Sequence, residues 1–128
     1  MIDISDPGDA VLRFLADRHL ATLTTLRADG SPHVVPVGFS YSPTERIARI
    51  ITFAPSMKAR HAARGGRAAV SQVDGGRWLT LEGSVRLVTD AAGVAAAVEG
   101  YAARYRQPSE RVDRVAIEIQ VDRIMGRA

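Results

Sequence analysis

The chain has 128 residues, of which 46% are hydrophobic and 24% are charged, a composition typical of a single globular domain spanning 1–128 and not of a disordered or fibrous protein. It contains no cysteine, which excludes disulfides, thiol catalysis and cysteine-ligated zinc. Sixteen arginines and one lysine leave a net charge of only +3, and few aromatic side chains stand between them, so we expect no nucleic-acid partner.

The ends and the apolar runs of the chain indicate where the protein resides. No apolar run reaches the length of a membrane span, and the first residues lack the basic segment of a signal peptide. We therefore expect a cytoplasmic protein with no membrane partner. We also expect residues 1–7, which precede the first predicted helix, to form a flexible N-terminal segment.

The first half of the chain predicts one helix and three strands. Asp6 and Pro7 are typical of a helix start, and apolar residues follow at helical spacing: Val11, Leu12, Phe14 and Leu15. Strand-forming residues fill Leu20–Arg27, His33–Tyr41 and Ile47–Phe53, and the turn signals between them predict an antiparallel meander.

The segment after the third strand predicts a short helix with a charged first turn. Ser56 is a good N-cap, and Gly65 follows the expected end of the helix. The start of a helix has free N–H donors and favours an anion, to which Lys58 would add a point charge and Arg60 a planar guanidinium. The segment is therefore either a phosphate site, in which the Ser56 hydroxyl also donates, or a capped surface helix with solvated charges.

The second half predicts three more strands and a third helix. Strands are expected at Ala68–Val73, Trp78–Leu87 and Val115–Val121, the last two with strict alternation of apolar and polar residues. Asp90 would cap an alanine-rich helix that ends near Tyr105, and a polar loop would follow it. The expected fold is mainly β, a six-stranded antiparallel β-barrel with three helices packed outside it.

Few residues match the usual catalytic or metal-binding patterns. There is no nucleophile elbow, no Walker loop and no Rossmann glycine motif. The histidines His19, His33 and His61 lack metal-ligand spacing, so we expect no metal site and treat them as surface or rim residues. Glu82 and Glu118 fall on polar strand faces, where they are expected to be solvated or paired with arginine.

Three strand residues are unusual. Pro36 lacks a backbone donor and Gly38 lacks a side chain, and such residues mark a strand edge, a bulge or the close approach of a flat ligand. Trp78 is the only tryptophan and points to the polar face of its strand, where it would join the core, form a subunit interface or cover a planar ligand.

Two blocks of sequence, Arg18–Phe39 and Ser71–Gly83, resemble the pyridoxamine-phosphate-oxidase-like split-barrel superfamily, which includes FMN-binding proteins. Within it, they are most similar to the actinobacterial branch of deazaflavin-dependent reductases. The resemblance extends from about residue 8 to residue 124, which is nearly the whole chain.

This resemblance implies a homodimer with the 8-hydroxy-5-deazaflavin coenzyme, known as factor 420, between the subunits. The strand that includes Pro36 and Gly38 would pass the deazaflavin ring, and the turn before Lys58 would hold the polar tail and its phosphate. Gln72 and Trp78 would approach from the partner subunit. The cofactor-binding residues that the resemblance implies are Val35, Pro36, Val37, Gly38, Thr52, Phe53, Ser56, Met57, Lys58, Arg60, Gln72 and Trp78.

The implied reaction is the transfer of hydride from the reduced coenzyme to a conjugated, anionic small molecule, with a biliverdin-like tetrapyrrole as the expected substrate. An arginine would stabilise the anionic product, and the candidates are Arg49, Arg60, Arg64 and Arg77. No side chain is assigned as a proton donor, so the catalytic residue is unknown. Two alternatives remain: an FMN-dependent reductase or oxidase of the same fold, and a non-catalytic binder of deazaflavin, haem or tetrapyrrole.

Overall fold

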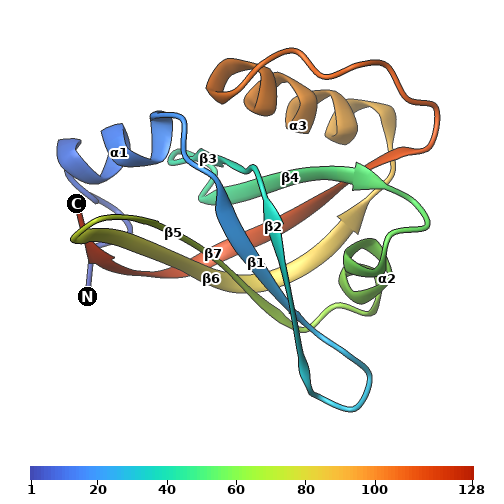
Figure 1. Ribbon diagram of the computed structural model, residues 1–128, viewed down its shortest axis with the longest axis horizontal. Helices are drawn as coiled ribbons and strands as arrows, with labels where there is room; N and C mark the ends of the chain where they lie inside the picture. Colours follow the sequence, from blue (N-terminus) through green and yellow to red (C-terminus); the bar gives the residue numbers. More distant parts are fainter.

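The computed structural model describes all residues, 1–128, as one β-sheet with three helices on its outside (Figure 1). The elements in chain order are α1 (Asp9–Ala16), β1 (Ala21–Leu26), β2 (Pro32–Val37), β3 (Ser40–Ser42), β4 (Ile47–Phe53), α2 (Met57–Arg64), β5 (Arg67–Asp74), β6 (Arg77–Val88), α3 (Ala91–Arg104) and β7 (Arg114–Arg127). None of the three helices is both long enough and apolar enough to cross a membrane.

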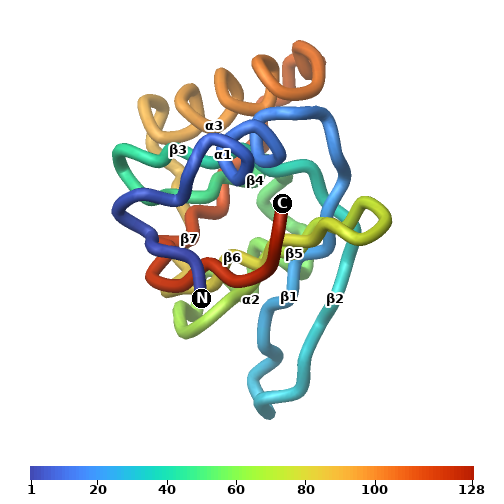
Figure 2. Tube along the Cα trace, turned by 90° about the vertical axis from the view of Figure 1, so that its left-hand side faces the viewer, coloured from blue at the N-terminus to red at the C-terminus, as the bar shows by residue number.

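The sheet has seven antiparallel strands in the order β2-β1-β5-β6-β7-β4-β3. β2 and β3 lie at its two edges, although only Gly38 and Phe39 separate them in the chain. The sheet must therefore curl until its edges approach each other, and Figure 2 shows the strands arranged around a common centre. No ladder joins the two edges, so the mainly β fold with three helices is confirmed, whereas the six-stranded barrel is corrected to a seven-stranded sheet that does not close.

The predicted meander of the first three strands is confirmed only in part. β1 pairs with β2 and β3 pairs with β4, both antiparallel, but the two ladders use different halves of the predicted second strand. The predicted strand His33–Tyr41 breaks after Val37 into β2 and β3, because Gly38 and Phe39 leave the ladder. β4 then pairs with β7 along its whole length, from Ile47 opposite Gln120 to Phe53 opposite Arg114, and makes no ladder with β2. A pairing between residues this far apart in the chain leaves no signal in local turn residues.

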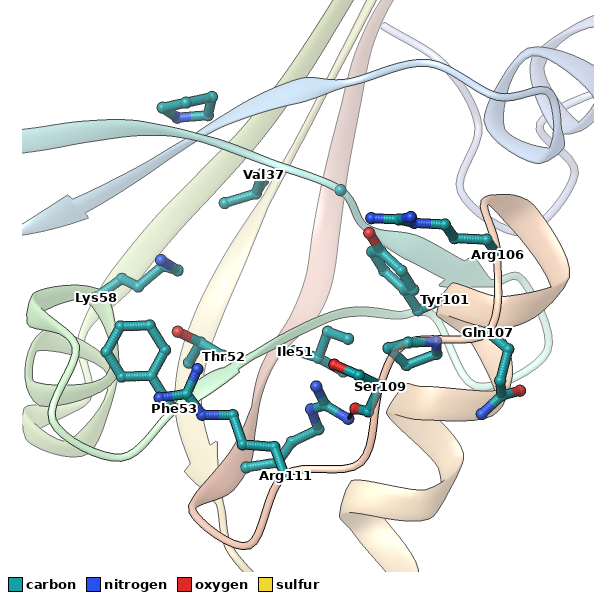
Figure 3. A pocket seen from close by; sticks show the side chains of 14 residues that line it. Val37, Ile51, Thr52, Phe53, Lys58, Tyr101, Arg106, Gln107, Ser109 and Arg111 are labelled. Carbon is teal, nitrogen blue, oxygen red and sulfur yellow. Dashed lines mark hydrogen bonds between the residues drawn. The ribbon is translucent and has the colours of Figure 1, made fainter.

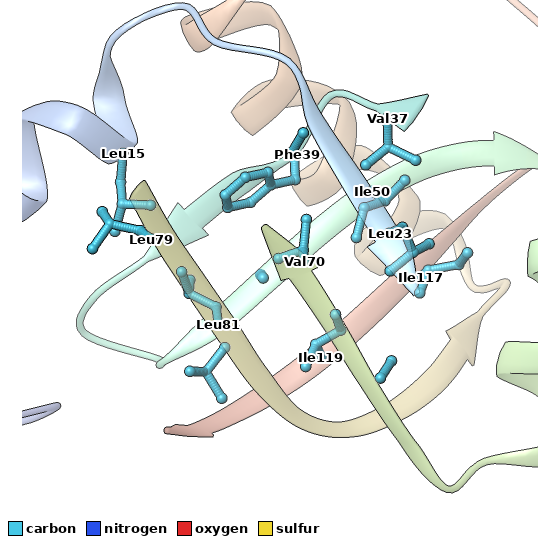
Figure 4. Close-up of a cluster of buried hydrophobic side chains, with 14 of the residues drawn as sticks. Leu15, Leu23, Val37, Phe39, Ile50, Val70, Leu79, Leu81, Ile117 and Ile119 are labelled. Carbon is cyan, nitrogen blue, oxygen red and sulfur yellow. The ribbon is translucent and has the colours of Figure 1, made fainter. Parts of the chain in front are cut away.

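The core lies inside the curled sheet, where alternate strand residues meet (Figure 4). On β6, Leu79, Leu81 and Val85 are buried as the alternation predicts. β7 is twice as long as predicted, because a bulge opposite Glu82 and Gly83 lets the strand continue past Val121 to Arg127. Burial of these apolar side chains supplies the main driving force for the fold.

Helix boundaries agree with the sequence where a side chain caps the helix. Ser56 caps α2 and Asp90 caps α3, through hydrogen bonds from the N–H groups of Ala59 and Gly93 respectively. The expected start of the first helix at Asp6 is wrong: α1 begins at Asp9, after Gly8 with a φ of 90°, and has no side-chain cap. Local capping chemistry therefore predicts two of the three starts.

The N-terminal segment makes contacts that the sequence did not predict. Ile2 forms an isolated bridge with Ile124 of β7, in which its N–H donates to the Ile124 carbonyl at 3.1 Å. Ile4 also packs against the core cluster. Residues 1–7, which we expected to be flexible, thus pack two apolar side chains, Ile2 and Ile4, against the core.

Two polar residues are buried against expectation. His61 is only 3% exposed and shares a hydrogen bond of 2.8 Å with the hydroxyl of Thr25, so it is not a surface or rim histidine. Glu118 is also buried and lies between the guanidinium groups of Arg49 and Arg86, which confirms the paired interpretation and excludes the solvated one. Buried charge in proteins is normally compensated in this way.

Candidate functional site

One pocket of about 620 Å³ lies where the ends of β2 and β4 meet the start of α2, the C-terminal half of α3 and the loop that leads to β7 (Figure 3). Its volume is that of an ordinary site for a small molecule or cofactor. Its apolar walls come from Pro36, Val37, Ile51 and Phe53, and its polar side chains come mainly from α2 and the loop.

The first turn of α2 presents donors to this pocket. The N–H groups of Met57 and Lys58 have no acceptor in the structure, because intrahelical bonding begins further along the helix. The Lys58 side chain lines the pocket and forms no ion pair, and partial burial lowers the pKa of its ammonium group. This arrangement suits a phosphate, which would give the Lys58 ammonium group the negatively charged partner that it lacks.

Ser56 supports this turn and does not line the pocket. Its hydroxyl accepts hydrogen bonds from the N–H of Ala59 at 3.2 Å and from the Thr52 hydroxyl at 2.9 Å. The residue is 8% exposed and does not line the pocket. Ser56 therefore fixes the helix start against the end of β4, and its direct contact with a cofactor stays a prediction.

The opposite wall is formed by backbone at Gly38. A Cβ atom at this position would lie 3.0 Å from ring carbons of both Tyr101 and Tyr105, closer than nearly all real contacts of that kind. The next peptide is held from α3, since the Phe39 N–H donates to the Tyr105 hydroxyl at 3.1 Å. Glycine is thus favoured here, because two tyrosine rings pack directly on the chain and would have to move for a larger residue.

The twelve predicted cofactor-binding residues separate into three groups. The pocket brings together six of them: Pro36, Val37, Gly38, Thr52, Phe53 and Lys58. Four more lie beside it without lining it: Val35, Ser56, Met57 and Arg60. The remaining two, Gln72 and Trp78, do not line this pocket.

Gln72 and Trp78 have different surroundings. Gln72 is fully buried, where its amide donates to the Phe14 carbonyl at 3.0 Å and accepts from Arg104 at 2.7 Å. Trp78 is 38% exposed and pairs across the strands with the exposed Val73. Within one chain, therefore, Gln72 has a structural role, and only Trp78 is free to contact another molecule.

The arginines expected to contact substrate do not line the pocket. Arg49 binds Glu45 and Glu118, and Arg64 donates to the Leu26 carbonyl. Arg77 pairs with Asp74 and Arg60 is exposed outside the pocket.

The sequence did not predict several residues that do line the pocket. Tyr101 lines the pocket from α3, Arg106 and Arg111 line it from the loop before β7, and Arg114 lines it from the first position of β7. The available signal was Arg111 inside the polar loop predicted at Gln107–Asp113, with Arg106 and Arg114 directly beside its two ends.

The pocket contains no obvious acid–base pair. No histidine, aspartate or glutamate lines it, and the ionisable or hydroxyl side chains are basic residues, Thr52, Tyr101 and Ser109. No group of three or more histidine, aspartate or glutamate side chains anywhere in the chain is arranged to hold a metal ion. Such a site can bind, orient and stabilise charge, and it suits a reaction whose chemistry comes from an organic cofactor.

Comparisons with known proteins agree with this geometry. Residues 8–127 match the family described as pyridoxamine 5′-phosphate oxidase. The F420H(2)-dependent biliverdin reductase of Mycobacterium tuberculosis (strain CDC 1551 / Oshkosh) is 53% identical over 121 residues, which cover 94% of this chain and 88% of that protein.

Solved structures of more distant proteins share the fold. An F420 reductase superimposes with a TM-score of 0.69 at 24% identity, over 94% of this chain and 98% of that one. A conserved hypothetical protein from Mycobacterium tuberculosis superimposes with a TM-score of 0.77 at 21% identity, over 93% of this chain and 83% of that one.

Proposed function

The chain belongs to the pyridoxamine 5′-phosphate oxidase family, and on that premise we propose that it is an oxidoreductase that uses the deazaflavin coenzyme known as factor 420. The observation that carries this proposal is the 53% identity to an F420H(2)-dependent biliverdin reductase across 94% of the chain. A conjugated, anionic tetrapyrrole such as biliverdin is the proposed substrate.

The residues present fit this coenzyme. The free N–H groups of Met57 and Lys58, with the Lys58 ammonium group, would bind its phosphate. The flat apolar wall of Pro36, Val37 and Gly38 would accept its ring, since no side chain projects from Gly38. When bound in its reduced form, the coenzyme supplies the hydride, so the protein needs only to bind, orient and stabilise charge.

The protein's own contribution to the reaction is electrostatic. Hydride transfer to a conjugated acceptor leaves negative charge on the product, and fixed cations around the pocket would stabilise that charge. Arg106 and Arg114 are suitably placed, since both line the pocket and neither forms an ion pair with a carboxylate. The Tyr101 hydroxyl, which also lines the pocket, is a proton donor available to the product.

We further propose a homodimer formed through the outer face of β2, β1, β5 and β6. By the strand register this face presents Val34, Val73 and Trp78, all of them exposed apolar side chains. Pro36 lies two residues after Val34 on the same face and also lines the pocket, so a partner seated here would reach the coenzyme. Light scattering should give a dimer mass for the wild type and a monomer mass for Val73→Lys.

The direct test is a fluorescence titration with oxidised deazaflavin coenzyme and, in parallel, with FMN. Micromolar or tighter binding of the deazaflavin alone is the expected result, followed by turnover of biliverdin with the reduced coenzyme. Preference for FMN would assign the chain to the flavin-dependent enzymes of this fold. Tight binding of the deazaflavin without turnover of any conjugated acceptor would instead indicate a non-catalytic carrier.

A further inference from the structure

The lining of the pocket has an unusual charge balance. Among its fourteen residues are four basic side chains, Lys58, Arg106, Arg111 and Arg114, and no acidic one. The chain as a whole has fourteen acidic residues against seventeen basic ones, so this separation of charge is local. One phosphate at the start of α2 would leave most of this positive charge without a partner.

Three of the four cations come from one segment, residues 106–114, which consists of the loop after α3 and the first residue of β7 and which we call the arginine loop. The Asp113 carbonyl accepts a hydrogen bond of 2.9 Å from the N–H of Ala54, which ties the loop to the turn before α2. The Arg114 guanidinium donates to the Ser109 carbonyl at 2.8 Å and so holds the loop's own curvature. These bonds place the arginines on the pocket even though α2 lies about fifty residues earlier in the chain.

The arginines of the loop are not equivalent. Arg111 packs its guanidinium over the Phe53 ring at 4.3 Å and pairs with Asp113, so its charge is already compensated. Arg106 has no hydrogen-bond or ion-pair partner, and Arg114 is bonded only to a neutral carbonyl. Figure 3 shows Arg106 and Lys58 at opposite sides of the pocket. Neither the Arg106 nor the Arg114 guanidinium is paired with a carboxylate, so both are available for a second anion.

We propose that Arg106 and Arg114 form a carboxylate subsite, separate from the phosphate site at the start of α2. A planar guanidinium matches a carboxylate in a bidentate geometry, whereas the single lysine and the free N–H groups of α2 suit a phosphate. The pocket would then bind two kinds of anionic group at its two ends. The inference rests on the proposed function for the source of the carboxylate, either the tail of the coenzyme or the substrate.

The subsite itself can be tested without the coenzyme. Labelled protein is titrated with glutarate, a simple dicarboxylate, and with inorganic phosphate, while NMR follows the Arg Nε–H signals and the amides of Met57 and Lys58. We expect saturable glutarate shifts at Arg106 and Arg114, and phosphate shifts at the two amides. Arg106→Ala should abolish the glutarate response and keep the phosphate response, whereas Arg13→Ala, which removes an exposed arginine from α1, should change neither.

Arg114→Lys provides a second variant that keeps the charge and the fold. It should weaken the glutarate response less than Arg106→Ala, because a lysine attracts a carboxylate but cannot bind it in bidentate fashion. Glutarate shifts that never saturate, or that are the same in Arg106→Ala as in Arg13→Ala, would overturn the carboxylate subsite.

A second set of measurements identifies the source of the carboxylate. If it is the coenzyme tail, Arg106→Ala should weaken binding of the full coenzyme about tenfold, as expected for loss of a hydrogen bond to a charged group. The affinity for a shortened coenzyme, which keeps the phosphate but lacks the carboxylates of the tail, should not change. If it is the substrate, the variant should raise KM for biliverdin and not for its dimethyl ester. If neither changes, the subsite is not used in the reaction and the inference is wrong. Wild-type protein that binds no deazaflavin would refute the proposed function instead, and the glutarate titration would still decide the subsite.

Discussion

The guanidinium of Arg104 donates a hydrogen bond of 2.7 Å to the carbonyl oxygen of Phe39 while only 8% of the residue is exposed. No carboxylate forms an ion pair with this buried charge, although the Asp17 carboxylate attracts it from a greater distance. Its other partners are the side chain of Gln72 and the carbonyl oxygens of Phe14 and Asp17 at the C-terminal end of α1, where the helix dipole is negative. Burial accordingly lowers the pKa of Arg104, yet the group remains a cation at neutral pH.

This arginine joins four elements of the fold, and its loss should be costly. Arg104→Met would leave the buried Gln72 side-chain oxygen without its donor and the Phe39 carbonyl with only the longer bond from the Tyr105 hydroxyl, so we expect the free energy of unfolding to fall by about 2–4 kcal/mol. Urea denaturation measures the change. Arg13→Ala, on the exposed face of α1, is the matched control and should stay within about 0.5 kcal/mol of wild type. Equal midpoints for the two variants would contradict this role.

Gly38 should matter to the site because two tyrosine rings pack on it. In Gly38→Ala the new methyl group would lie about 3.0 Å from the rings of Tyr101 and Tyr105, which must move apart to accommodate it. We expect about 1–2 kcal/mol of lost stability from this overpacking and weaker coenzyme binding, because the rings and the wall shift together. Calorimetry and the fluorescence titration measure the two effects.

Gly76→Ala is the matched control for that substitution. Nothing lies within 4 Å of a Cβ atom at Gly76, and its φ is outside the left-handed region, so alanine should be tolerated there. If Gly38→Ala binds the coenzyme as tightly as Gly76→Ala does, the wall at Gly38 does not contact it.

Lys58→Ala tests the phosphate site at the start of α2. Loss of a charged donor should weaken coenzyme binding by about 1.5–3 kcal/mol, whereas folding should hardly change because Lys58 forms no ion pair. Arg60→Ala removes an exposed charge from the next turn and should have a much smaller effect. Comparable losses in the two variants would point to a diffuse attraction and not to a phosphate bound at Lys58.

The same lysine predicts a pH dependence of binding. Burial lowers the pKa of Lys58 below its ordinary value, so the free protein loses this charge at a less alkaline pH than a solvated lysine does. Coenzyme affinity should therefore be full at neutral pH and fall as the pH rises through that lowered pKa, with proton uptake on binding in this range. Lys58→Arg should remove the alkaline fall, since arginine stays protonated.

The sequence predicted the parts of this fold that depend on neighbouring residues. The Ser56 and Asp90 caps and the alternation on β6 are local patterns, and all three are confirmed. The order of the strands is not local, because β4 pairs with β7 more than sixty residues later. The arginine loop was missed for the same reason, since contacts between distant residues, such as the hydrogen bond between Ala54 and Asp113, place it on the pocket.

The buried His61 predicts that the fold weakens in mild acid. Its Nδ1 atom shares a hydrogen bond of 2.8 Å with the Thr25 hydroxyl, and its ring packs edge-on against His33 at 4.8 Å. Burial, followed by the nearby positive charges of His33, Arg64 and Arg27, lowers the pKa of His61 below the ordinary value of 6.5. The unfolded chain therefore binds this proton more readily than the folded one.

The sign of the effect follows from that difference in proton binding. Above pH 6.5 this group should not reduce the free energy of unfolding. As the pH drops from 6.5 towards the lowered pKa, the free energy of unfolding should fall, with a slope of at most about 1.4 kcal/mol per pH unit for one proton. Urea midpoints between pH 7.5 and pH 5 measure this slope. His61→Gln cannot take up the proton and should flatten it. A slope that survives in His61→Gln would mean that another group, and not the buried imidazole on α2, controls stability in mild acid.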